Sequence, residues 1–218
     1  MAQDQLQTML GTEYFSYQIP ESCAFDVHYS MWVRYLWNNI DGLRYLKKIN
    51  VVDEVNYLAI HILLLYISRT HISWSALTWE RNAAIWLAIK MEMVNEVSCS
   101  APVFLSELLI IEGSRSNQRM LLRAEQQLCL GCSFSFAPVL AHHFCDVGIT
   151  ILGLNSRQSE IKTFLRRISC TSVYITNSPA TIASVAMISK CPEHKQEILT
   201  LFKVETCLVN FLVSIFEN

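Results

Sequence analysis

Hydrophobic residues along this chain recur mostly at helical spacing, and segment 79–93 departs most from the usual amphipathic pattern. From Ala83 to Ile89 the segment is apolar on every side and contains no Pro or Gly. A helix that is apolar all round is buried among other elements, and this one is too short to span a bilayer. We therefore predict a central helix packed inside a helical domain, with Lys90 and Glu92 where the apolar pattern stops.

Helical periodicity covers most of the remaining chain, and Gly and Pro stand between the periodic segments. Asp53 and Ser73 lie at the starts of two segments, where we expect them to cap helices. No alternating strand pattern persists, which predicts an all-α fold class. The expected helices cover 5–10, 25–36 and slightly beyond, 53–68, 73–91, 102–111, 116–130, 139–152, 156–174, 179–190, and 193 to the C-terminus with a break near 204.

The helical periodicity of the hydrophobic residues is interrupted at 134–138, FSFAP, and then resumes. We predict an N-terminal helix and connector over 1–22, a helical domain over 23–136, and a second, smaller helical domain over 137–218. Two stacked all-helical halves are the architecture expected of such a pattern.

Composition and charge narrow the classes of partner. The 218 residues are 52% hydrophobic, which predicts a full core and an exposed apolar patch for a protein partner. The net charge of −2 argues against nucleic acid as the main ligand, because phosphate binding needs a basic face. The N-terminus lacks the basic region of a signal peptide, and no apolar run reaches transmembrane length. We expect an intracellular protein that does not bind membranes and keeps its eight cysteines reduced.

A metal centre is the main alternative use of the cysteines. Cys129, Cys132, His142, His143 and Cys145 are zinc-ligand types at close spacing. A structural zinc site usually has two clear ligand pairs on tight turns, whereas the first two cysteines fall in or at the end of a predicted helix. We expect no metal and no cofactor. The chain also lacks a nucleophile elbow, a phosphate loop and a paired-carboxylate arrangement, so we predict that it is not an enzyme.

Four segments resemble the cyclin box in content, order and spacing. LAIHILLLYIS at 58–68 is similar to the second helix of the box, and WLAIKME at 86–92 is similar to the end of its central helix. AEQQLC at 124–129 resembles its fifth helix, and FSFAP at 134–138 resembles the linker into the second box.

Within the cyclin family, the D-type branch is the most similar. DQLQTML at 4–10, followed by Glu13, resembles the N-terminal helix of that branch, and KME at 90–92 resembles its SKMKE motif. NSPATIA at 177–183 and ETCL at 205–208 resemble its later motifs. The branch's LxCxE motif and C-terminal regulatory tail are absent, as in the short cyclins of gammaherpesviruses.

The resemblance implies two stacked cyclin-box domains of about five helices each, the second one shortened. It implies a regulatory subunit that forms a heterodimer with a host cyclin-dependent protein kinase, activates it allosterically and promotes cell-cycle progression. The kinase's substrates would be further partners. It also implies a location in the nucleus and cytoplasm of a host cell.

Lys90 and Glu125 match the two cyclin residues that face the kinase and bond to its backbone. Each alone has an ordinary explanation: a lysine at a helix C-terminus is favoured by the helix dipole, and an acid on a helix surface needs no function. Together, and in register with the family, they predict a kinase-binding site. The neighbouring residues assigned to that site are Met91, Glu92 and Leu128.

The chain departs from the family at a buried ion pair. Trp32 stands where the first helix of the box has Arg, and Leu64-Leu65 replaces the Asp-Arg of the second helix. Loss of both charges is tolerable, whereas one charge left alone would be stranded in the core. The change also alters the predicted substrate-recruitment patch, to which we assign Met31, Trp32, Tyr35 and Leu36.

These departures keep a second hypothesis open, in which the chain is a cyclin-fold scaffold, like transcriptional or meiotic cyclin-like proteins, that does not activate a kinase. Retention of both Lys90 and Glu125 argues against it. A DNA-binding role is disfavoured by the acidic charge balance.

Overall fold

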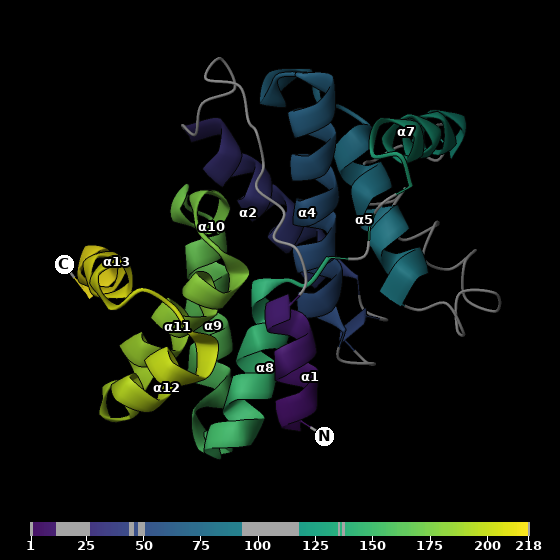
Figure 1. The fold of residues 1–218 in the computed structure, drawn as a ribbon. Helices are drawn as coiled ribbons and strands as arrows, with labels where there is room; N and C mark the ends of the chain where they lie inside the picture. The colour runs from purple at the N-terminus through teal and green to yellow at the C-terminus, as the bar shows by residue number, and fades with distance from the viewer. Residues whose placement is uncertain are drawn as a thin grey trace. The chain divides into compact units, whose positions relative to one another are not determined.

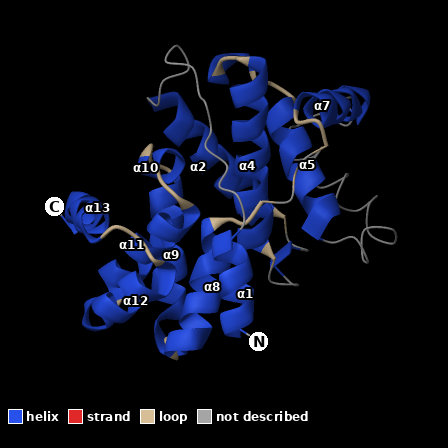
Figure 2. Cartoon of the chain, viewed as in Figure 1, coloured by secondary structure: helices blue, strands red, loops and turns tan. Residues whose placement is uncertain are grey.

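A computed structural model of the chain describes residues 2–11, 27–43, 46–47, 51–92, 118–134, 136 and 138–217. Helices and the turns between them make up these ranges, and no strand occurs within them (Figure 2). The predicted all-α fold class is therefore confirmed. None of the helices in the described ranges is long and apolar enough to cross a membrane.

The chain divides into two compact units. The first, which we call the central-helix unit, is Tyr17–Ala137. The second, the terminal unit, combines Met1–Ser16 with Pro138–Asn218. The first helix of the chain thus packs with the C-terminal helices, where α1 (Ala2–Gly11) lies against α8 (Ala141–Leu152) (Figure 1).

The central-helix unit is built around α5 (Glu80–Glu92). This helix lies between α4 (Val52–Thr70) and α7 (Gln118–Gly131), and it also contacts α2 (Val27–Gly42) (Figure 1). Every residue of α5 from position 82 to position 89 is buried. The prediction of a buried central helix is confirmed, and the small side chains of Ala83, Ala84 and Ala88 allow neighbouring helices to approach closely.

The predicted cap at Asp53 is wrong, although the predicted start of this helix lies within one residue of the observed start. Helix α4 begins at Val52, so Asp53 lies in its first turn, and Val51 occupies the capping position without a side-chain bond. An acid in the first turn still interacts favourably with the helix dipole.

The predicted helix over 73–91 is two elements. A short 3₁₀ turn, η2 (Trp74–Ala76), is followed by an extended residue, Leu77, and α5 starts only at Glu80. The Thr78 backbone N–H donates to the Glu80 carboxylate at 2.9 Å, and this bond joins the preceding segment to the first residue of α5. The predicted helix over 102–111 lies outside the described residues.

The C-terminal end of α7 is held against α4 by a close approach at Gly131. A β-carbon at this position would lie 2.5 Å from the Tyr66 ring, so only glycine fits. Just beyond, the Cys132 thiol donates to the Ile62 carbonyl at 3.6 Å, and the Arg69 guanidinium donates to the Cys132 carbonyl. These contacts set the position of α7 relative to the rest of the unit.

The terminal unit has its own buried helix, α11 (Pro179–Lys190), whose bounds match the prediction. Ser178 caps it by accepting a hydrogen bond from the Thr181 backbone N–H at 2.9 Å. Around α11 pack α8, α9 (Gln158–Ser169), α12 (Lys195–Phe202) and α13 (Thr206–Glu217). The smaller elements of the unit are η4 (Asn155–Arg157), α10 (Val173–Thr176) and η5 (Pro192–His194).

The prediction of one helix over 156–174 is wrong, because α9 ends at Ser169 and α10 follows as a separate turn. The Ser169 and Thr171 hydroxyls donate to backbone carbonyls of the last turn, and such bonds compete with continuation of a helix. The predicted break near 204 is confirmed: Lys203 adopts a left-handed conformation, with φ at 53°, between α12 and α13.

Candidate protein-binding site

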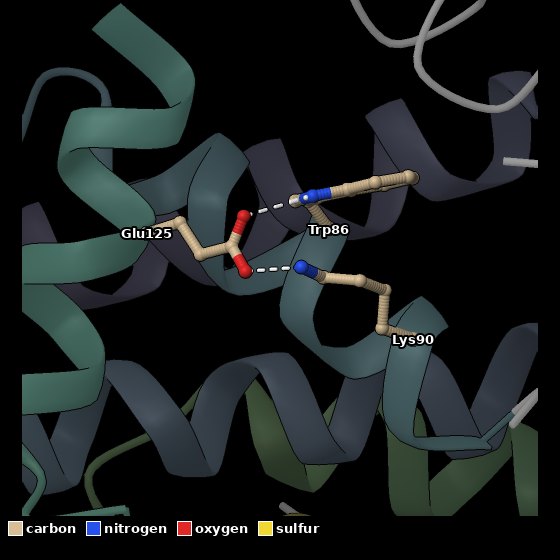
Figure 3. A network of polar contacts seen from close by, with 3 residues as sticks. All are labelled: Trp86, Lys90 and Glu125. Carbon is tan, nitrogen blue, oxygen red and sulfur yellow. Dashed lines mark hydrogen bonds and ion pairs between the residues drawn. The ribbon is translucent and has the colours of Figure 1, made fainter. Parts of the chain in front are cut away.

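Lys90 and Glu125, far apart in the sequence, form an ion pair at the edge of the central-helix unit (Figure 3). Lys90 lies in the last turn of α5, and its ammonium group donates to Oε1 of Glu125, which lies midway along α7. The side chains retain 34% and 15% of their exposure, so the pair borders solvent without being fully hydrated. The packing of α5 against α7 brings together the two residues that the sequence had placed in one site.

Trp86 joins this pair, and the sequence analysis did not assign it to the site. Its indole N–H donates to Oε2 of Glu125 at 3.0 Å. Its ring centroid lies 5.2 Å from the Lys90 nitrogen, within cation–π range. The four-residue spacing of Trp86 and Lys90 places both on one face of α5, and this spacing was the available signal. The spacing does not stand out in the sequence, because Trp86 lies inside a segment that is apolar all round.

A cysteine thiol lies within the electrostatic reach of the pair. Cys129 follows Glu125 by one turn of α7 and is half-buried. Its pKa is raised first by burial and then by the negative charge of Glu125, while the positive charge of Lys90 acts in the opposite direction. The thiol is therefore protonated at neutral pH and adds no charge to the site.

The other residues predicted for kinase binding differ in their exposure to solvent. Met91 is half-buried and Glu92 is exposed, both at the end of α5 beside Lys90. Leu128 is fully buried on the inner face of α7, so its side chain packs within the unit and is not displayed at this surface.

The predicted substrate-recruitment patch on α2 is a partly buried aromatic cluster. The rings of Trp32 and Tyr35 meet edge to face with centroids 5.7 Å apart. The guanidinium of Arg81, from the first turn of α5, lies over both rings at 4.6 and 4.4 Å. Met31 is 60% exposed, whereas Leu36 is buried. The surface therefore carries a cation–π cluster beside one exposed methionine.

The two positions on α4 that depart from the cyclin-box pattern belong to the core. Leu64 and Leu65 are both buried, with almost no exposed surface. A carboxylate at position 64 would be desolvated and would need a basic partner. An apolar residue at position 64 is therefore consistent with Trp32 in place of the basic residue on α2.

The candidate zinc ligands serve other contacts. Cys132 belongs to the central-helix unit and bonds to a carbonyl, while Nδ1 of His143 accepts from the Leu140 backbone N–H at 3.0 Å. Burial raises the pKa of the Cys145 thiol and, together with the nearby His143 and Lys162 charges, lowers that of His142. Among the residues that the structure describes, no group of three or more His, Cys, Asp or Glu could hold a metal ion, and the cysteines are free thiols.

No protein-family model matches the chain, and no curated protein matches its sequence significantly. Among solved structures, it is similar to a viral cyclin from herpesvirus saimiri, with a TM-score of 0.73 over 98% of this chain and 94% of that chain. The two sequences are 12% identical, so the likeness concerns the fold. The chain has the cyclin fold, and the predicted resemblance to viral cyclins is confirmed at the level of structure.

Proposed function

We propose that the chain is a regulatory subunit that binds and allosterically activates a cyclin-dependent protein kinase of a host cell. The observation that carries the proposal is the Lys90–Glu125 pair, partly exposed at the junction of α5 and α7 in a chain with the cyclin fold. These are the two positions that the cyclin resemblance assigns to kinase contact.

The chemistry of the pair suits the backbone of a protein partner. An ammonium group has three donors, and Lys90 directs one of them at Glu125. Each carboxylate oxygen of Glu125 can accept a further bond. One donor head and one acceptor head, held side by side, match the carbonyl and N–H groups of a peptide chain, and charge-assisted bonds to such groups are strong.

In this proposal the chain contributes no catalytic group to phosphoryl transfer. It binds the active conformation of the kinase more tightly than the inactive one, and so shifts the kinase population toward the active form. Such binding would position the kinase helix whose Glu pairs with the ATP-binding Lys, and would clear the activation loop. The complex would act in the nucleus and cytoplasm of a host cell on the kinase's own substrates and promote cell-cycle progression.

The direct test is kinase stimulation. The purified chain is mixed with monomeric cyclin-dependent kinases and ATP, and phosphorylation of histone or of the retinoblastoma protein is measured. We expect stimulation of at least one kinase, and loss of it when Lys90→Ala is combined with Glu125→Ala. Failure of the wild-type chain to stimulate any kinase would refute the proposal.

A matched control comes from the terminal unit. Lys162 and Asp146 form another ion pair between two helices, with a 3.0 Å contact and comparable exposure. The double variant Lys162→Ala with Asp146→Ala is expected to stimulate as the wild type does. If the Lys90 and Glu125 double variant also stimulates fully, the kinase is bound through a different surface.

The second candidate is a cyclin-fold scaffold that binds partners without activating a kinase. The specific observation in its favour is that the Arg81 guanidinium lies over the rings of Trp32 and Tyr35, so two residues of the predicted substrate-recruitment patch already have a partner within the chain. A chain that co-purifies with a kinase yet leaves its phosphorylation rate unchanged would support this candidate.

A further inference from the structure

Trp86 contacts both members of the Lys90–Glu125 pair (Figure 3). Its side chain is buried in the core of the central-helix unit, and its indole N–H is directed at the Glu125 carboxylate. Glu125 is thus bound at both oxygens, by the Lys90 ammonium at Oε1 and by the indole at Oε2. The two donors come from consecutive turns of α5, whereas the acceptor comes from α7.

The two donors differ in how firmly they are held. Lys90 has a long side chain with many rotamers and borders solvent, so an ion pair with it alone would hold Glu125 weakly. Trp86 has two side-chain torsions, and burial confines both. The indole N–H therefore gives the carboxylate a fixed partner, and the carboxylate in turn orients the ammonium group.

We propose that Trp86 is a positioning residue for the partner-binding surface, holding Glu125, and through it Lys90, in the binding arrangement before any partner arrives. Groups that are already ordered in the free protein lose less conformational freedom on binding, which strengthens the complex. The consequence for kinase affinity rests on the function proposed above. The arrangement itself is a property of the free chain and is tested without a partner.

A simpler explanation is that the buried indole needs an acceptor and Glu125 happens to be near. In that case the bond would stabilise the fold and have no effect on binding. The chain offers a matched control for this alternative, because Trp74 is also buried but its indole nitrogen has no hydrogen-bond partner among the described residues.

The first experiment follows the indole N–H resonances of the ¹⁵N-labelled chain. The Trp86 signal is assigned by its loss in Trp86→Phe. We expect it to lie downfield of the Trp74 signal, and to move upfield in Glu125→Ala while the Trp74 signal stays in place. A Trp86 signal that is unaffected by Glu125→Ala would overturn the proposal, whether or not a kinase partner exists.

The second experiment measures affinity for a kinase that the wild-type chain stimulates. Trp86→Phe keeps an aromatic ring but removes the N–H. We expect about a tenfold weaker Kd, because the Glu125 and Lys90 side chains would then have to be ordered on binding. Trp74→Phe makes the same substitution at the control position and is expected to bind as the wild type. Benzothienylalanine at position 86, which replaces the N–H with sulfur at constant shape, is expected to weaken binding equally without leaving a cavity.

A double-mutant cycle separates positioning from general stability. If Trp86 acts through Glu125, then Trp86→Phe causes no further loss in a Glu125→Ala background. An equal loss in both backgrounds, or an unchanged Kd for the benzothienylalanine variant, would show that Trp86 serves only the fold. Absence of any kinase binding by the wild type would refute the proposed function, while the indole resonance would still decide the role of Trp86.

Discussion

Gly131 ends α7 directly against the ring of Tyr66 on α4, where a β-carbon would lie 2.5 Å from two ring carbons. The Tyr66 side chain is buried, and because protein interiors are close-packed, its ring could move away only by displacing its neighbours. The same contact sets the end of α7, the helix that carries Glu125.

We expect Gly131→Ala to lower the free energy of unfolding by about 1–3 kcal/mol, the usual cost of overpacking a core. Urea unfolding followed by circular dichroism measures it. Gly11→Ala is the control, because no atom of the described residues lies within 4 Å of a β-carbon there. Equal stability of the Gly131 variant and the wild type would contradict the close approach.

The buried His61 makes stability depend on pH. Burial, with a smaller contribution from the Arg69 charge, lowers its pKa from 6.5 to about 4. The folded state therefore holds the imidazole neutral, while the unfolded state takes up a proton below pH 6.5, so stability falls as pH drops from about 6.5 toward 4. Burial also lowers the pKa of His142, which acts in the same direction.

From these values, about 2 kcal/mol of stability is lost through His61 between pH 7 and pH 5. Urea unfolding at several pH values measures the slope. His61→Leu is expected to make the slope shallower, whatever it does to stability at pH 7. An unchanged slope would show that His61 does not titrate as its burial requires.

The N-terminus of α11 depends on one hydroxyl. Ser178 accepts the Thr181 backbone N–H at 2.9 Å, so Ser178→Ala is expected to cost about 1 kcal/mol of stability. Ser73 occupies the equivalent position before η2 but makes no such bond, so Ser73→Ala is expected to cost less. Thermal unfolding of the two variants compares them, and a larger loss for Ser73→Ala would contradict this interpretation.

A lone charge at position 64 should not be tolerated. Leu64 is fully buried, so Leu64→Asp is expected to destabilise the chain by roughly 3 kcal/mol or more, because the carboxylate would be desolvated or forced to protonate. Leu122→Asp introduces the same group on the exposed side of α7 and is expected to change stability little. Yields of soluble protein and urea midpoints distinguish the two, and a stable Leu64→Asp variant would mean that water or a base reaches this position.

The local sequence was sufficient to predict most helices. Helical periodicity, with Gly and Pro residues between the periodic segments, located α11 at its observed bounds. The apolar segment from Ala83 to Ile89 correctly indicated a buried central helix. Such signals are local, because helical hydrogen bonds join residues four apart and burial selects apolar side chains on the same scale. The errors fell at helix ends, where the side chains of Glu80, Ser169 and Thr171 compete with backbone bonding.

The sequence by itself thus determined the all-helical class, the central helix and two candidate residues, Lys90 and Glu125. Only the tertiary structure decided that these two meet, because they lie 35 residues apart on helices whose relative position depends on packing at Gly131 and along α5. The tertiary structure also decided the role of Trp86, because the sequence of an apolar segment does not show which group the indole N–H of its tryptophan contacts. A hydrogen bond across two helices depends on where those helices pack, and no local pattern encodes that position.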